Sequence, residues 1–414
     1  MPAGTKIRYM GNKVALAKDV ATLISDIEAS RPLVDLFGGM CSVAGAVSNS
    51  ARQVWINDAQ HYASLAAHCL LRSQDLPPSR DRVVSVLSPA YRKNLNTLGR
   101  RFKQDLATER RILSRDSFSA YQQAQVEWKH VGNDEVLAAE AAKLRTQGQA
   151  GPHRLATLTF SWGYFGLRQS IEIDSVRAAI DASIGLGLLT SDEAAWCRLA
   201  LLQTCSRVAS TPGHFAQFLT GANAQSFARI RSARRRSVWD GVLDDLEILE
   251  PFGTKRWRKR NRVLTGDALS IWPILDCANL PPAVFYADPP YSKEQYSRFY
   301  HVLETLELYD YPEATGTGRY RSGRFTTPLA QKSGVLRAVQ RLCCEIAARD
   351  GVLLLSYPSS GLLTRSLDVD IQALLGEYFQ DVSLPISMLS KHSTLGARHG
   401  EARCDVTEYV WLAK

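Results

Sequence analysis

Short apolar runs that end in small or acidic residues dominate the hydrophobic pattern of this chain. Four of them have the length of buried strands: residues 33–36, 53–58, 263–265 and 283–287. Runs that are almost continuously apolar are typical of parallel strands covered on both faces. By contrast, residues 134–146 are rich in Ala, Leu, Glu and Lys, and residues 191–207 carry apolar side chains at helical spacing. The pattern predicts an α/β fold with a mostly parallel sheet, interrupted by a mostly helical segment.

The fourth run leads directly into Asp288, Pro289, Pro290 and Tyr291. The carboxyl end of such a strand is where open α/β sheets place their chemistry. The two prolines have no backbone N–H, so the polar groups of this turn are mainly acceptors, above all the Asp288 carboxylate. An exocyclic amino group can donate both hydrogens to such acceptors, and Tyr291 offers a flat face on which a base can stack. The turn therefore predicts a catalytic site for an amino group on a base.

Acids also follow the first three runs. The first run contains Asp35 and continues through Phe37 to small residues such as Gly39, which allow the backbone to approach a ligand. Asp58 ends the second run 23 positions after Asp35, close to the spacing at which doubly wound sheets place an acid for ribose hydroxyls. Asp267 follows the third run and is suited to an adenine amino group. No GxGxxG motif follows the first run, which argues against an NAD enzyme.

In this order the motifs resemble those of the DNA adenine methylases. The resemblance implies a Rossmann-like sheet that binds S-adenosylmethionine and a target-recognition segment between the second and third cofactor motifs. It implies transfer of a methyl group to the N6 amino group of adenine in double-stranded DNA, with the base flipped out of the duplex. It further implies pairing with a restriction or other defence system, and it leaves the oligomeric state open.

Three further segments carry the resemblance. Residues 6–13 look like the family's opening motif, which casts Tyr9 and Lys13 as contacts to the methionine end of the cofactor. Residues 352–357 and 406–411 look like the later strands of the sheet. The family usually has glycine where this chain has Cys41, so a positive φ at that position would cost roughly 1 kcal/mol or more.

Two other functions stay open at this point. A cytosine-N4 or RNA amino-methyltransferase could use the same acceptors, although aspartate at position 288, where such cytosine enzymes often have serine, favours adenine. The chain could also be a DNA-binding subunit without catalysis. The presence of Asp58, Asp267 and the complete Asp-Pro-Pro-Tyr motif argues against such a loss of catalytic function.

The motif positions divide the chain into two expected domains. Residues 1–72 and 262–414 form a discontinuous catalytic domain, and residues 73–261 form a mostly helical insertion that we expect to recognise the target.

Positive charge is concentrated in the insertion. The net charge is +9 and the isoelectric point is near 9.1, which favours a polyanionic partner. Two basic clusters supply the residues that we expect to contact DNA phosphates: Arg234, Arg235, Arg236, Lys255, Arg256 and Arg258. The aromatic segment 160–169 fits either a core-packing cluster or the border of the base pocket. The basic segment 311–328 fits either a DNA-ordered loop or an ordinary surface loop, and His301 and Glu304 fit either packing or contact with the target strand.

Composition excludes several other classes. The eight cysteines include no CxxC pair, so neither a zinc site nor a disulfide framework is indicated, and no metal is expected. No stretch approaches the roughly 20 apolar residues that cross a membrane, and the N-terminus has no signal-peptide core. We therefore expect a cytoplasmic protein that does not bind membranes.

Overall fold

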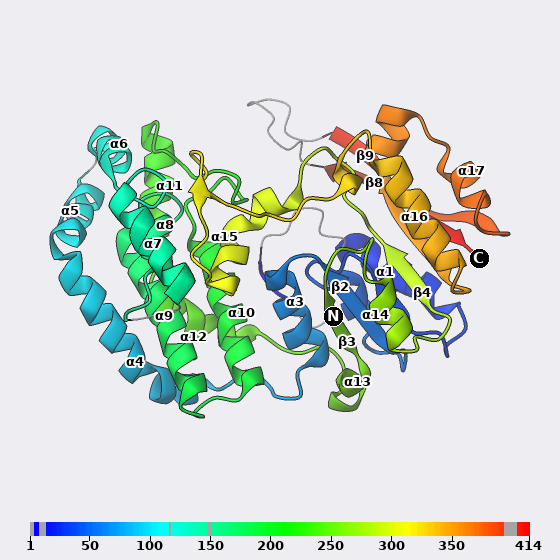
Figure 1. Ribbon diagram of the computed structural model, residues 1–414, viewed down its shortest axis with the longest axis horizontal. Coiled ribbons are helices and arrows are strands. Elements are labelled where there is room, and N and C mark those ends of the chain that lie inside the picture. The colour runs from blue at the N-terminus through cyan, green and yellow to red at the C-terminus, as the bar shows by residue number, and fades with distance from the viewer. Residues whose placement is uncertain (1–3, 8–13, 116, 148–150, 393–403) are drawn as a thin grey trace.

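The computed structural model describes residues 4–7, 14–115, 117–147, 151–392 and 404–414. It forms a region built on a sheet and a helical region beside it (Figure 1). The predicted cofactor contacts Tyr9 and Lys13 lie outside the described residues.

A seven-stranded sheet forms the first region, in the order β3-β2-β1-β4-β7-β9-β8. Its strands are β1 (Leu33–Asp35), β2 (Val54–Asp58), β3 (Arg262–Thr265), β4 (Val284–Ala287), β7 (Val352–Pro358), β8 (Val382–His392) and β9 (Cys404–Ala413). Strands β3, β2, β1, β4 and β7 are parallel, whereas β9 runs antiparallel to both of its neighbours. The predicted mixed α/β fold with a mostly parallel sheet is confirmed, and it is consistent with a methyltransferase sheet.

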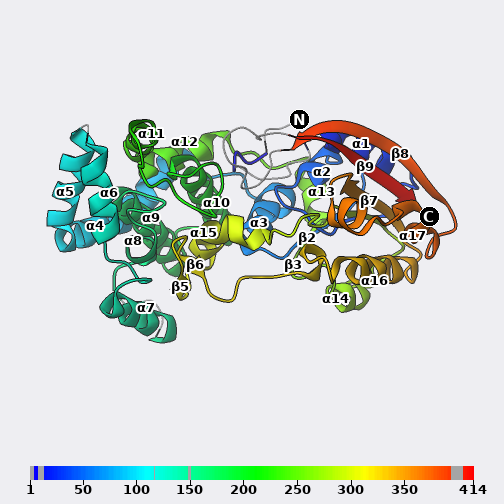
Figure 2. The same ribbon diagram turned by 90° about the horizontal axis from the view of Figure 1, so that it is seen from above.

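Helices cover both faces of this sheet (Figure 2). Alternate residues of β4 point into different hydrophobic clusters, with Val284 and Tyr286 on one side and Phe285 and Ala287 on the other. The first cluster is shared with α1 (Val14–Ser25), α2 (Ser42–Ala46) and α3 (His61–Ala67). The second is shared with α14 (Trp272–Cys277), α16 (Val335–Ala347) and α17 (Ile371–Gly376). Burial on both faces explains why the strands read as continuous apolar runs.

The strand order reverses between β1 and β4. From β1 the chain continues to β2 and β3 on one side of the sheet, and it later returns to β4 on the other side. The two strands pair directly, with Asp35 opposite Tyr286. Connections that leave in opposite directions open a crevice at the carboxyl ends of such strands, which is where α/β proteins bind ligands.

Helices occupy most of residues 80–260. They are α4 (Arg80–Arg101), α5 (Lys103–Ser114), α6 (Phe118–Glu127), α7 (Glu135–Gln147), α8 (Leu155–Thr159), α9 (Leu167–Gly185), α10 (Ser191–Val208), α11 (Ala224–Arg234), α12 (Val238–Ile248) and α13 (Lys255–Arg260). The start of α10 has a clear local cause, because Thr190 and Glu193 each accept a hydrogen bond from the other's backbone N–H at 3.0 Å. One hydrophobic cluster includes Leu33 of the sheet and Trp196 of α10. The core is thus continuous between the regions, and the division into a catalytic domain and a target-recognition insertion stays a prediction.

A segment that follows β4 also packs on the helical region. It contains α15 (Tyr296–Leu308) and the hairpin of β5 (Ala314–Thr315) and β6 (Tyr320–Arg321), which lies against α15 in both views (Figures 1 and 2). The remaining short helical turns are η1 (His68–Arg72), η2 (Pro328–Ala330) and η3 (Leu362–Ser366). None of the described helices combines the length and the apolar character that a membrane crossing requires.

Candidate active site

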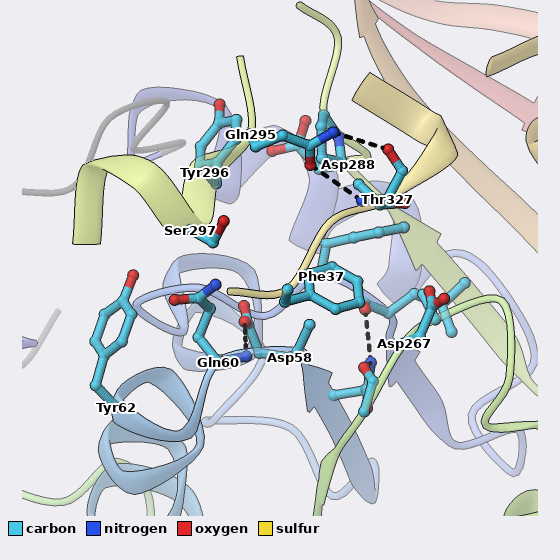
Figure 3. Close-up of a pocket in the computed structure, with 17 residues that line it drawn as sticks. Phe37, Asp58, Gln60, Tyr62, Asp267, Asp288, Gln295, Tyr296, Ser297 and Thr327 are labelled. Atoms are coloured by element: carbon cyan, nitrogen blue, oxygen red, sulfur yellow. Dashed lines mark hydrogen bonds between the residues drawn. The ribbon is translucent and has the colours of Figure 1, made fainter. Parts of the chain in front are cut away.

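A pocket lies at the carboxyl ends of β1, β2, β3 and β4 and is covered by α15 and the segment after the hairpin (Figure 3). The space within it is about 790 Å³, part of it open to solvent. Its lining residues are Leu36, Phe37, Asn57, Asp58, Ala59, Gln60, Tyr62, Gly266, Asp267, Ala268, Asp288, Pro290, Gln295, Tyr296, Ser297, Phe325 and Thr327. The pocket occupies the crevice that the reversal of strand order predicts.

Phe37 brings an aromatic ring into the pocket from the turn after β1. Figure 3 shows this ring between the side chains of Asp58 and Asp267. Asp35, which ends β1, is buried and does not line the pocket, although its Oδ1 accepts the Phe37 N–H at 3.3 Å. Burial raises the pKa of Asp35 to about 8, and the nearby Asp288 carboxylate adds to the rise. Asp35 therefore supports the turn and remains largely protonated at neutral pH.

Cys41 adopts the left-handed conformation, with φ 64° and ψ 27°. The sequence predicts a cost at Cys41, where the family usually has glycine, if this position requires a positive φ. The position does require one. A side chain with a Cβ carries a cost of roughly 1 kcal/mol there. The thiol is buried, and burial raises its pKa well above the ordinary value, so it is unreactive.

Asp58 joins the first two turns of the site. Its Oδ2 accepts the N–H of Gly39 and its Oδ1 accepts the N–H of Gln60, each at 2.9 Å. Burial raises the pKa of Asp58 to about 6 despite these hydrogen bonds. Asp58 also lines the pocket, whereas Gly39 does not. The acid at the end of β2 thus holds the glycine turn in place in addition to facing the ligand space.

Glu304 of α15 holds the start of α3 beside Asp58. Its carboxylate accepts the backbone N–H groups of His61 and Tyr62 at 3.0 and 3.1 Å. His301, one turn earlier, is fully buried with Nε2 3.0 Å from the Phe215 carbonyl oxygen, and burial lowers its pKa to about 3. For both residues the structure favours packing over contact with a target strand.

The predicted acceptor Asp288 lines the pocket together with Pro290. Pro289 is buried behind them, and Tyr291 packs against the hydrophobic cluster on the α16 side of the sheet rather than lining the pocket. Base stacking by Tyr291 stays a prediction. Asp267 lines the pocket after β3 and accepts the Leu269 N–H at 3.0 Å.

Several pocket residues were not identified from the sequence. Gln60 and Ser297 are 7% and 4% exposed, and neither Gln60 Oε1 nor Ser297 Oγ makes a hydrogen bond within the described part of the chain. Gln295 and Thr327 form a reciprocal pair, in which each donates to the other at 3.1 and 3.0 Å and fixes the covering segment (Figure 3). No local motif marks these positions. Gln60 follows β2, whereas Gln295, Ser297 and Thr327 reach the sheet only through the path of α15 and the segment after the hairpin.

Two of the six predicted phosphate contacts are corrected by their burial. Arg234 is 2% exposed; its guanidinium lies 3.7 Å from Glu109 and over the rings of Tyr121 and Trp162. The ion pair and the ring contacts hold the Arg234 guanidinium in the protein interior, so it is not available to a phosphate.

Arg258 is 4% exposed, and its guanidinium donates to the carbonyl oxygens of Ser73, Phe252 and Gly253. It therefore stabilises the connection between η1 and α13 and is not available to a phosphate.

The other four predicted contacts are exposed: Arg235, Arg236, Lys255 and Arg256. The two clusters do not form one surface, because α11 and α13 lie far apart in both views (Figures 1 and 2). In addition, α13 directly precedes β3 and so lies at the amino end of that strand, whereas the pocket lies at the carboxyl ends. DNA contact by these four residues stays a prediction that their placement does not favour.

The aromatic segment 160–169 is a packing cluster. Phe160, Trp162 and Tyr164 are all buried, and the Tyr164 hydroxyl donates to the Phe215 carbonyl oxygen. Arg319 from the hairpin segment donates to the Ser161 carbonyl oxygen at 2.7 Å and to that of Thr159, just before the segment, at 2.8 Å. The sequence left packing and the border of the pocket as equal alternatives for this segment. The structure shows packing.

Among the residues that the structure describes, no group of His, Cys, Asp and Glu side chains could hold a metal ion. Carboxylates after β2, β3 and β4 offer hydrogen-bond acceptors, and Phe37 offers an aromatic face, which together suit a nucleoside. The fold and the pocket are therefore consistent with the methyltransferase class.

Comparison with known proteins finds a family model that matches part of the chain. Residues 9–107 and 274–328 match the sequence model described as D12 class N6 adenine-specific DNA methyltransferase. These two segments of the chain are thus similar to these methyltransferases, as the motif order indicated. Both matched segments contain pocket residues, whereas most of the helical region lies between them.

Individual relatives carry corresponding names. The chain is 24% identical to the type II methyltransferase M.FokI of Planomicrobium okeanokoites over 60% of its own length and 34% of that protein. It is 26% identical to the modification methylase LlaI of Lactococcus lactis subsp. lactis, over 38% of the chain and 22% of that protein. For the type II methyltransferase M.NlaIII of Neisseria lactamica the identity is 25%, over 52% of the chain and 57% of that protein. The matches thus cover from about a fifth to just over half of these relatives.

Proposed function

We propose that the chain is a site-specific DNA methyltransferase that moves a methyl group from S-adenosylmethionine to the N6 amino group of adenine. The observation that carries the proposal is the position of Asp288 and Pro290 in one pocket with Asp58 and Asp267. The match to an N6 adenine-specific family supports adenine over cytosine.

The pocket fits the nucleoside part of the cofactor. We assign the ribose hydroxyls to Asp58, the adenine amino group to Asp267 and a face of the adenine ring to Phe37. When bound, S-adenosylmethionine supplies a methyl group that its positive sulfur already activates. No covalent intermediate with the protein is therefore required, and the task of the chain is alignment and charge placement.

Asp288 accepts hydrogen bonds from the target amino group in this mechanism. The adjacent prolines contribute no N–H donors that would compete for the carboxylate. Asp35 is largely protonated at pH 7, because its pKa is about 8, and so it adds no second negative charge beside Asp288. After transfer the surplus proton on nitrogen passes to Asp288 or to water.

The target base must leave the duplex to reach Asp288, at a cost of a few kcal/mol. We propose double-stranded DNA as the substrate, action in the cytoplasm and, because two relatives are named type II methyltransferases, pairing with a restriction system. These assignments rest on relatives that the chain covers only in part.

Methyl transfer to genomic DNA, followed by mass spectrometry of the nucleosides, tests the reaction. We expect N6-methyladenine from the wild-type chain. Asp288→Asn should lower turnover by about 10²–10³-fold or more, the scale of losing one preorganised electrostatic contact, with cofactor affinity nearly unchanged by calorimetry. Asp381→Asn, at an exposed acid before β8, serves as the control. N4-methylcytosine as the product, or near-normal turnover of Asp288→Asn, would contradict the proposal.

A further inference from the structure

Two arginines from different segments share the ring of Tyr320. The Cζ of Arg298 in α15 lies 5.5 Å from the ring centroid, and the Cζ of Arg324, after the hairpin, lies 4.7 Å from it. The ring itself is fixed, because its hydroxyl donates to the Ala216 carbonyl oxygen and accepts from Arg298 Nε at 3.2 Å. Tyr320 thus holds two cations close together.

Among the residues that the structure describes, no buried acid neutralises either cation. The acid that pairs with Arg298 there is Glu294, at 3.5 Å, and both side chains of this pair are well exposed, which makes the ion pair weak. Arg324 pairs with no carboxylate among the described residues, and its Nη1 makes no hydrogen bond to them. Like charges held together without an acid between them raise the energy of the free protein. An anion that binds both would relieve this repulsion.

The neighbouring arginines show the contrast. Arg319 is buried and donates to two carbonyl oxygens, and Arg321 pairs with Asp310 at 2.7 Å. Both are committed to holding the hairpin. Of the four arginines around Tyr320, only Arg298 and Arg324 remain available to a ligand.

The pair is located next to the pocket. Arg298 directly follows Ser297, and Arg324 directly precedes Phe325, and both of these neighbours line the pocket. Arg298 is exposed and Arg324 is half-buried, although Nη1 of Arg324 is itself covered, and both residues adjoin the space into which a flipped base would pass. When a flipped base occupies the pocket, the backbone phosphates of its nucleotide remain outside the pocket.

We propose that Arg298 and Arg324 bind a backbone phosphate of the DNA strand beside the flipped target nucleotide. Guanidinium groups bind phosphate oxygens through paired N–H donors, and Tyr320 presets both groups for this contact. The inference rests on the proposed function and deepens it, because it names the part of the substrate that this rim of the pocket holds. We thus assign this phosphate contact to the α15 and hairpin segments and not to the two basic clusters of the helical region.

The salt dependence of DNA binding tests the assignment. A labelled duplex of about 30 base pairs and mixed sequence is titrated with the full chain at several salt concentrations. Arg298→Gln and Arg324→Gln should each flatten the slope of log affinity against log salt, and the double variant should flatten it by about 0.9, the value for one lost phosphate contact. Arg298→Lys and Arg324→Lys keep the charge and should keep most of the slope.

Matched controls separate binding from folding. Arg341→Gln removes the same charge from an exposed position on α16 and should leave the slope unchanged. Thermal melting and calorimetric titration with S-adenosylmethionine should match the wild type for every variant. A lower melting temperature in both the Gln and the Lys variants, with an unchanged slope, would mean that the arginines only pack on Tyr320.

The two proposals fail differently. Wild-type slopes in both Gln variants, or weaker cofactor binding in place of weaker DNA binding, would overturn the phosphate site whether or not the chain methylates DNA. Flatter slopes in the Gln variants of a chain that transfers no methyl group would retain the phosphate site and refute the proposed reaction.

Discussion

Gly38 lies at the closest approach between the turn after β1 and strand β2. A Cβ added there would lie 2.5 Å from Ile56 Cδ1 and closer still to Ile56 Cγ1, whereas ordinary contact begins near 3.4 Å. Ile56 is buried and cannot turn aside freely. The turn is also pinned, because Gly38 N–H donates to the Asn57 carbonyl oxygen at 2.8 Å. Gly38→Ala must therefore displace one side of this contact by about 1 Å.

We expect Gly38→Ala to lower the free energy of unfolding by about 1–3 kcal/mol, the usual cost of overpacking a core by one methyl group. Cofactor affinity should fall as well, because the shifted turn carries Phe37 into the pocket.

Gly266 provides the matched control. It directly follows strand β3 and lines the pocket, but a Cβ there would meet only Ile271 Cγ2, at 3.6 Å. Gly266→Ala should change the free energy of unfolding by less than about 0.5 kcal/mol.

A double-mutant cycle tests the cause. Urea unfolding is measured for Gly38→Ala, Ile56→Ala and the combination. Ile56→Ala alone should cost about 2–5 kcal/mol, but the combination should cost less than the sum by more than about 0.5 kcal/mol, because the second change removes the clash. Strict additivity, or a Gly38→Ala variant as stable as the wild type, would refute this account of the turn.

Two further predictions follow from buried charge. Arg234→Met should lower the free energy of unfolding by about 3 kcal/mol, because it removes a buried cation beside Glu109, whereas Arg235→Met at the exposed neighbouring position should stay within about 0.5 kcal/mol by urea unfolding. Asp35 has a folded-state pKa of about 8 against 3.8 for the free side chain, so the folded protein keeps a proton that the unfolded chain has lost. Its stabilising contribution is complete below roughly pH 4 and is lost as the pH rises through 8, by at most about 1.4 kcal/mol per pH unit. Asp35→Asn should flatten the dependence of unfolding free energy on pH in this window, and an unchanged profile would contradict the assignment.

The sequence by itself determined the sheet and the acids at its edge. Apolar runs too short for helices, each ending in an acid or a small residue, located β1, β2, β3 and β4 and placed Asp58, Asp267 and Asp288 at one edge. This worked because strand periodicity and parallel burial are local properties, and because the carboxyl ends of parallel strands meet at one edge.

Only the tertiary structure decided which cations are available. Arg234 and Arg235 are adjacent in one basic run, yet the first is buried and the second is exposed. Consecutive residues point in different directions around a helix, so a charge count cannot tell a structural arginine from one at the surface.

The tertiary structure also decided what covers the pocket. Ser297 and Phe325 carry no sequence signal, and they reach the sheet only because α15 and the hairpin segment pack between the two regions. The strand ends that supply the acids follow from local pattern, whereas the residues that close the pocket depend on contacts between segments distant in sequence. Pairings of this kind are set by shape and burial in the folded chain, which no local pattern records.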